Sequence, residues 1–162
     1  MTDHHKEFMN FAVQEAQKAK SDVPVGAIIV KNGQILASAH NEKEKTNDVT
    51  AHAEIITIRQ VSQQLENWRL DGAIMYVTLE PCPMCATAII YSRISEVYFG
   101  AYDTLYGAFG SCTDMKNVLH SNIKIYGGIQ EDDCSSLLKE FFKKTRNFHL
   151  KVPSSPDTTN KS

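Results

Sequence analysis

Two short segments carry side chains that could hold a metal ion. Residues 52–54 read His-Ala-Glu, and residues 81–85 read Pro-Cys-Pro-Met-Cys, with two residues between Cys82 and Cys85. This spacing lets both sulfur atoms bind one ion, at about 2.3 Å from zinc. Each segment is predicted at the start of a helix, where free N–H groups and the helix dipole favour the thiolate that a metal requires. The segments therefore predict one metal centre formed by two helix N-termini.

The number of ligands indicates a catalytic metal centre. His52, Cys82 and Cys85 supply three ligands, whereas a structural zinc site is normally closed by four. A free position admits water, and zinc lowers the pKa of such water to about 7. Glu54 lies two residues after His52 and could shuttle protons without binding the metal. His-x-Glu followed by Pro-Cys-x-x-Cys is the known signature of zinc-dependent nucleobase deaminases.

The hydrophobic pattern around these segments predicts an α/β fold. An amphipathic helix is expected over 4–20, and strands are expected over 25–30 and 34–40. Asn32-Gly33 between the two strands is typical of the tight turn of an antiparallel hairpin. The remaining expected elements are a loop over 42–48, a helix over 51–65 capped by Thr50, a strand over 73–79, a helix over 83–91, a strand at 97–99, a loop over 100–111 and a strand over 123–126. Strands that alternate with helices in this way favour a layered α/β architecture.

The last helix has the clearest pattern. Its apolar stripe consists of Cys134, Leu137, Leu138, Phe141, Phe142 and Thr145. The helix opens with acids at 131–133, and its later part carries a basic cluster at 139, 143, 144 and 146. The helix dipole alone favours this order. Bases beside Phe142 also suit RNA, because splayed nucleobases stack on aromatic rings while cations contact phosphates. The residues by themselves leave both explanations open.

Composition limits the class of protein. The chain has 162 residues, of which 42% are hydrophobic and 22% charged, and its net charge is −2. These values predict one globular domain and exclude a strongly basic nucleic-acid binder. The domain is expected over 1–150, and the two Pro and six Ser, Thr or Asn of residues 153–162 indicate a flexible C-terminal tail at 151–162. No stretch approaches the roughly 18 apolar residues of a membrane span. The N-terminal residues are polar and unlike a signal peptide, so we expect a cytoplasmic protein.

Several segments resemble the bacterial tRNA-specific adenosine deaminases. They are residues 22–27 (Asp-Val-Pro-Val-Gly-Ala), 50–55 (Thr-Ala-His-Ala-Glu-Ile), 78–85 (Thr-Leu-Glu-Pro-Cys-Pro-Met-Cys), 92–94 (Ser-Arg-Ile), and Leu137-Leu138, Phe141-Phe142 and Arg146. The resemblance extends over about residues 5–147. The zinc motif is shared by cytidine, guanine and adenosine deaminases, whereas segment 78–85 and the Phe-Phe helix are more particular to the tRNA enzymes.

The resemblance implies a fold and an activity. The fold would be a three-layer α/β/α sandwich around a mixed five-stranded sheet, cytidine deaminase-like, in a homodimer with one Zn²⁺ per subunit. The activity would be conversion of adenosine to inosine at the wobble position of an arginine tRNA, bound through its anticodon stem-loop.

The resemblance also implies residue roles. His52, Cys82 and Cys85 would bind the metal, and Glu54 would be the catalytic acid and base. The residues implied to bind substrate are Asn41, which would hydrogen-bond the flipped purine, Val25 in the purine pocket, Asp103 beside the flanking nucleotides, and Phe142 and Arg146 at the anticodon loop.

Two departures from the family pattern flank the expected RNA channel. Val49 stands where the family usually has Pro, and Leu105-Tyr106 replaces a segment that more often carries Lys. Neither change affects the metal ligands.

Two other interpretations remain. The enzyme could deaminate a free base or nucleoside, such as guanine or cytosine, with the same metal site and no RNA surface. Alternatively, the metal could only hold the fold together, which requires a fourth ligand such as Cys112 and predicts no activity.

Overall fold

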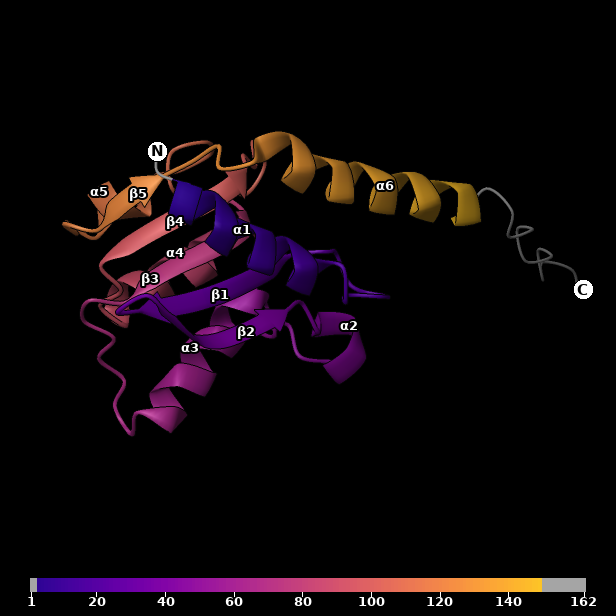
Figure 1. The fold of residues 1–162 in the computed structure, drawn as a ribbon. Coiled ribbons are helices and arrows are strands. Elements are labelled where there is room, and N and C mark those ends of the chain that lie inside the picture. The colour runs from indigo at the N-terminus through magenta and orange to yellow at the C-terminus, as the bar shows by residue number, and fades with distance from the viewer. Residues whose placement is uncertain (1–2, 150–162) are drawn as a thin grey trace, which may run out of the picture.

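The computed structural model describes residues 3–149 and has three layers, with helices on both faces of one central sheet (Figure 1). The tail expected at 151–162 lies outside the described residues. In chain order the elements are α1 (Asp3–Ala16), β1 (Gly26–Lys31), β2 (Gln34–His40), α2 (Lys43–Thr46), α3 (Ala53–Gln64), β3 (Ile74–Leu79), α4 (Pro83–Tyr91), β4 (Glu96–Ala101), α5 (Met115–Val118), β5 (Lys124–Tyr126) and α6 (Glu131–His149).

The sheet is mixed and has five strands in the order β2-β1-β3-β4-β5. Strand β1 is antiparallel to both β2 and β3, whereas β3, β4 and β5 are parallel. Asn32 and Gly33 both have positive φ, 52° and 74°, as the tight turn of the β1–β2 hairpin requires. The expected mixed five-stranded sheet is thus confirmed.

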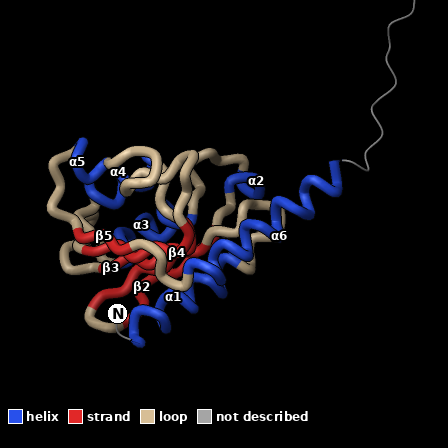
Figure 2. Tube along the Cα trace, turned by 90° about the horizontal axis from the view of Figure 1, so that it is seen from above, coloured by secondary structure: helices blue, strands red, loops and turns tan. Residues whose placement is uncertain are grey.

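The two faces of the sheet bury different side chains because successive strand residues point in opposite directions. Ile29, Val77 and Phe99 pack in a cluster with residues of α3 and α4. Ile28 and Tyr76 pack on the other face, with residues of α1 and with Cys134 of α6. Figure 2 shows these helices on the two sides of the strands. This is the three-layer sandwich that the resemblance implies.

Helix α6 extends past the sheet. Its beginning packs on β4 through buried Cys134, and its later turns project beyond the strands in both views (Figures 1 and 2). The apolar stripe continues into this part, so Phe142 remains 49% exposed. Neither α6 nor any other helix within residues 3–149 is long and apolar enough to cross a membrane.

Some elements differ from the sequence prediction. Helix α1 ends at Ala16 instead of residue 20, because the amides of Lys18 and Ala19 bond three residues back, to the carbonyls of Glu15 and Ala16. The segment 42–48, expected as a loop, contains the four-residue helix α2. Helix α5 was not predicted either. A helix of four residues is too short to show a hydrophobic period.

Candidate active site

The two predicted ligand segments meet beyond the carboxyl end of β3. His52 is the residue before α3 and Cys82 is the residue before α4, so both helices begin at the site. Pro83 occupies the first turn of α4, where its missing N–H leaves no bond unmade. Cys85 lies in the same turn and is 0% exposed. The two helix N-termini therefore converge, as their sequence positions predict.

Three donor atoms of these segments face one another. Nδ1 of His52 lies 3.7 Å from Sγ of Cys82 and 3.5 Å from Sγ of Cys85. All three atoms are within 4.8 Å of each other. A tetrahedral zinc ion, at about 2.3 Å from sulfur and about 2.0 Å from nitrogen, holds such atoms about 3.6 Å apart. Both the donor types and their spacing fit a zinc ion.

The cluster contains no fourth protein ligand among the described residues. Cys112, the candidate for that role, is exposed and does not belong to the cluster. This contradicts the interpretation in which Cys112 closes a purely structural site. A set of three protein ligands leaves one coordination position for water or substrate.

Hydrogen bonds shift the pKa values of the three ligands in different directions. The Cys85 thiol donates to Cys82, which lowers the pKa of Cys82 to about 4. The same contact raises the pKa of Cys85, and the hydrogen bond with Cys82 raises the pKa of His52. Cys82 is thus a thiolate at neutral pH, and a thiolate is the form that binds metal ions.

Glu54 is the buried acid beside the cluster. Its side chain is 4% exposed and lines the same cavity as His52 and Cys82. Burial raises the pKa of its carboxyl to about 7, because the charged form loses its hydration. The carboxyl is not one of the three clustered donors. A carboxyl with a pKa near neutrality can both accept and donate a proton.

Asn41 fixes the start of α3. Its Oδ1 accepts a hydrogen bond from the backbone N–H of Ala53 at 2.9 Å, and its Nδ2 donates to the Val23 carbonyl at 3.1 Å. Thr50, the expected cap, instead donates to Asp48, and His52 precedes the helix without a capping bond of its own. The cap of α3 therefore comes from the end of β2.

A cavity of about 1130 Å³ lies over the cluster. Val25, Asn41, Asp103 and Phe142 line it, so the structure brings these four residues to the same cavity as His52 and Glu54. Val25 is 4% exposed, and its buried side chain forms part of the wall. This volume lies just above that of cavities which enclose small organic ligands, about 300–1,000 Å³.

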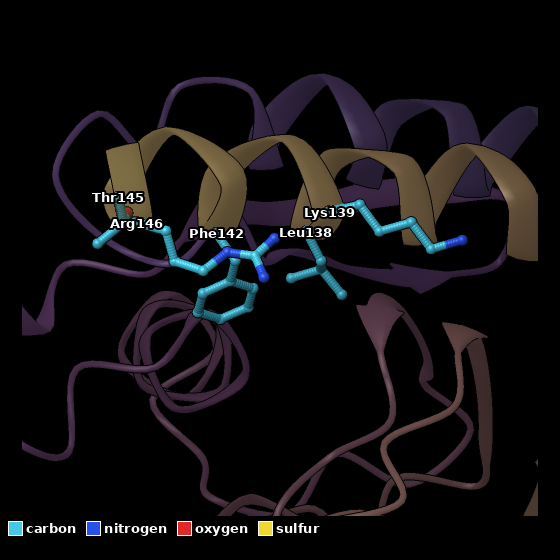
Figure 3. Close-up of a pocket in the computed structure, with 5 residues that line it drawn as sticks. All are labelled: Leu138, Lys139, Phe142, Thr145 and Arg146. Atoms are coloured by element: carbon cyan, nitrogen blue, oxygen red, sulfur yellow. The ribbon is translucent and has the colours of Figure 1, made fainter. Parts of the chain in front are cut away.

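Arg146 lies next to this cavity and does not line it. Together with Lys139 it borders a shallower groove of about 410 Å³ along α6. Leu138, Phe142 and Thr145 belong to both hollows, so the groove continues the cavity. Figure 3 shows Leu138 and Phe142 pointing away from the same side of the helix.

Two buried acids at the cavity are absent from the sequence prediction. Asp22 is 4% exposed and accepts a hydrogen bond from the backbone N–H of Glu44 at 2.8 Å, which anchors α2. Glu80 is 2% exposed and accepts backbone hydrogen bonds from the loop after β4. Both acids lie in segments that resemble the family, 22–27 and 78–85, and this resemblance is the sequence signal that could have identified them.

The family comparison agrees with this site. Residues 2–101 match the model of the cytidine and deoxycytidylate deaminase zinc-binding region. The match includes the three clustered ligands and Glu54.

Relatives that match most of the chain belong to a narrower group than this family model. The tRNA-specific adenosine deaminase of Bacillus subtilis is 41% identical over 143 residues, which cover 86% of this chain and 89% of that protein. The tRNA-specific adenosine deaminase of Aquifex aeolicus is 43% identical over 145 residues, covering 86% and 95%. A solved structure from a study of A-to-I editing by tRNA:A34 deaminases superposes with a TM-score of 0.76 at 40% identity, over 82% of this chain and 99% of the other.

Proposed function

The chain belongs to the cytidine and deoxycytidylate deaminase family, among the tRNA-specific adenosine deaminases, and we propose that it converts adenosine to inosine at the wobble position of an arginine tRNA. The reaction adds water at carbon 6 of the purine and releases ammonia. Inosine pairs with more than one third-codon base, so the product would broaden decoding.

One observation carries the proposal. The three donor atoms and the buried acid Glu54 lie at a cavity whose rim continues into the groove of α6. A free base needs only the cavity. The adjoining groove, with Phe142 and Arg146, gives the nucleotides on either side of the target a place to bind. This extension supports RNA over a free base or nucleoside as the substrate.

The proposed metal is Zn²⁺, one per subunit, bound by His52, Cys82 and Cys85. Their donor types and spacing support it. A bound zinc ion would activate water for attack at neutral pH.

Glu54 would move the protons of the reaction. Its carboxylate would take one proton from the attacking water and deliver it to N1 of the purine. It would then take the remaining proton from the hydroxyl at carbon 6 and pass it to the amine, which leaves as ammonia while the carbonyl forms. The raised pKa of Glu54 supports this role, because the group must exist in both protonation states during one turnover. Burial also keeps bulk water from exchanging the proton before it is delivered.

The substrate contacts would divide between the cavity and the groove. Val25 would pack against the flipped purine. The two backbone contacts of Asn41 use one proton of its NH₂ group and one lone pair of its Oδ1, so its second proton and second lone pair could hydrogen-bond the purine. Asp103 would lie beside the flanking nucleotides, which its place in the cavity wall supports. Phe142 and Arg146 would contact the anticodon loop.

We also propose a homodimer in the cytoplasm. Support for the dimer comes from α4, which contains no charged residue in its nine residues and leaves Tyr91 64% exposed at its end. An apolar helix surface of this kind is typical of an interface between subunits. Sedimentation of the purified protein at twice the monomer mass of 18.2 kDa is the expected result.

The decisive experiment compares substrates. Purified, zinc-loaded protein is incubated with an anticodon stem-loop of arginine sequence carrying wobble adenosine, and with free adenosine, guanine and cytidine. Inosine in the stem-loop, detected by mass spectrometry, is the expected product. A stem-loop with its adenosine moved by one position serves as the control and should remain unmodified.

Two results would contradict the proposal. Turnover of a free base alone would assign the site to small-molecule deamination. Full turnover of protein that retains no transition metal after chelation would refute the proposed zinc chemistry.

A further inference from the structure

The buried side chain of Glu80 holds the loop after β4, which forms one wall of the cavity. Oε1 of Glu80 accepts hydrogen bonds from the backbone N–H groups of Phe109 and Ser111, at 3.0 and 3.1 Å. Oε2 accepts from the N–H of Asp103 at 3.1 Å. Three amides of one loop thus converge on a side chain that is 2% exposed. Hydrogen bonds to a charged, buried acceptor are among the strong ones in proteins.

The backbone of the same loop comes very close to this carboxylate at Gly107. A Cβ atom at position 107 would lie within 2.4 Å of both the Asp103 carbonyl and Oε2 of Glu80, so only glycine fits there. Gly107 is itself buried, and its N–H donates to the Asp103 carbonyl at 2.8 Å. The space at position 107 is thus a second sign, beside the three amide bonds, that the loop packs closely on Glu80.

The loop connects the metal-ligand segment with the substrate cavity. The N–H of Ala108 donates to the Pro81 carbonyl at 2.8 Å, next to Cys82. At the other end, Asp103 accepts from the amides of Leu105 and Tyr106, which places both side chains at the cavity, 73% and 67% exposed. Exposed apolar side chains on a loop held this firmly are suited to contact a ligand, not the core.

We propose that Glu80 is a positioning residue for substrate recognition: it fixes the wall 102–106 relative to the metal-ligand segment, so that this wall can contact the nucleotides next to the target adenosine. The inference rests on the proposed function and deepens it. Glu80 touches neither the clustered donors nor the reacting atoms in this role. Its loss should therefore weaken RNA binding more than it slows the chemical step.

The test is Glu80→Gln, measured with the zinc-loaded protein. The glutamine oxygen can still accept from Phe109 and Ser111, but its NH₂ group cannot accept from Asp103, so only the 102–106 arm loses its anchor. Expected is a rise of about tenfold in KM for the stem-loop with kcat changed by less than about threefold. Zinc content should equal that of the wild type. Amide hydrogen exchange, followed by NMR, should accelerate at 103–106 and stay slow at 109 and 111.

A matched control is Glu96→Gln. Glu96 begins β4 at the opposite end of the strand and accepts from the Tyr98 hydroxyl and Lys124, away from the cavity. This variant should leave KM and the exchange of loop 102–111 unchanged.

Three results would overturn the inference. Glu80→Gln could match Glu96→Gln in KM and in loop exchange. It could instead lower kcat or zinc content at constant KM, which would place Glu80 in the chemistry. Finally, the Asp103 amide of the wild type could exchange at the rate of an unprotected amide, a result that does not depend on the variant folding. If the wild type leaves the stem-loop unmodified, the proposed function fails, and the exchange data still decide whether Glu80 anchors the loop.

Discussion

The floor and the rim of the cavity differ in how the protein holds their side chains. At the floor, Cys85 and Glu54 are 0% and 4% exposed, and each sits in the first turn of a helix packed on the sheet. At the rim, Leu105 and Phe142 are 73% and 49% exposed, on a loop and on a helix that extends past the sheet. The core thus fixes the floor, whereas hydrogen bonds to the buried Glu80 side chain and one projecting helix fix the rim.

This difference separates chemistry from recognition. Burial shifts the pKa of Glu54, and the starts of two helices packed on the sheet bring three metal donors together. Exposed aromatic and basic side chains can instead meet a large substrate without rearrangement of the core. Changes at the floor should abolish turnover, and changes at the rim should weaken affinity.

The largest expected effect is at the floor. Glu54→Ala should lower turnover of the stem-loop by about 10²–10⁴-fold, because no other group replaces the proton shuttle. Zinc content, measured by atomic emission, should not change, since the three donor atoms are intact. Cys85→Ser is the comparison variant and should lose zinc as well as activity. Normal deamination by Glu54→Ala would contradict the assigned role.

A smaller effect is expected at the rim. Phe142→Ala should weaken stem-loop binding by about tenfold, the loss of one base stacked on an aromatic ring. Arg146→Ala should lower the slope of log affinity against log salt by about 0.7, because one phosphate contact to a single strand is lost. Fluorescence titration at several salt concentrations measures both.

Arg69→Ala is the matched control for the rim. Arg69 is paired with Asp71 and lies over the Trp68 ring, outside both hollows. Its removal should leave affinity and salt slope unchanged. If both Phe142→Ala and Arg146→Ala bind the stem-loop with unchanged affinity, the projecting part of α6 does not contact the RNA.

The sequence predicts the floor better than the rim for a physical reason. Helix starts, apolar runs and the His-x-Glu and Pro-Cys-x-x-Cys spacings are local, so their residues are readable from the chain itself. Helix α4 over 83–91 and strand β2 over 34–40 agree with the prediction to the residue. The anchoring bonds of the rim join residues far apart in the sequence, for example Glu80 to Phe109. No local pattern reports such a bond.

The same limit explains the error at residue 50. Thr is a common helix cap, and the sequence offers Thr50 close to the start of α3. The structure uses Asn41 instead, 12 residues before the amide that it caps. Whether a side chain reaches a helix end depends on where the sheet places it, which hydrophobic periodicity does not specify.

The smallest expected effect concerns this cap, which ties the end of strand β2 to the floor helix α3. Asn41→Ala leaves the N–H of Ala53 without its partner and should lower the free energy of unfolding by about 1 kcal/mol. Both Asn41→Ala and Asn41→Asp lose the bond to the Val23 carbonyl, but Asn41→Asp keeps the acceptor for Ala53. It also adds a negative charge where the helix dipole favours one, so it should cost less than Asn41→Ala. Urea unfolding of the two variants without RNA measures the difference and keeps it separate from any contact with the purine. Equal stability of Asn41→Ala and the wild type would show that α3 keeps its start without Asn41, and the floor would then be independent of the strand that borders it.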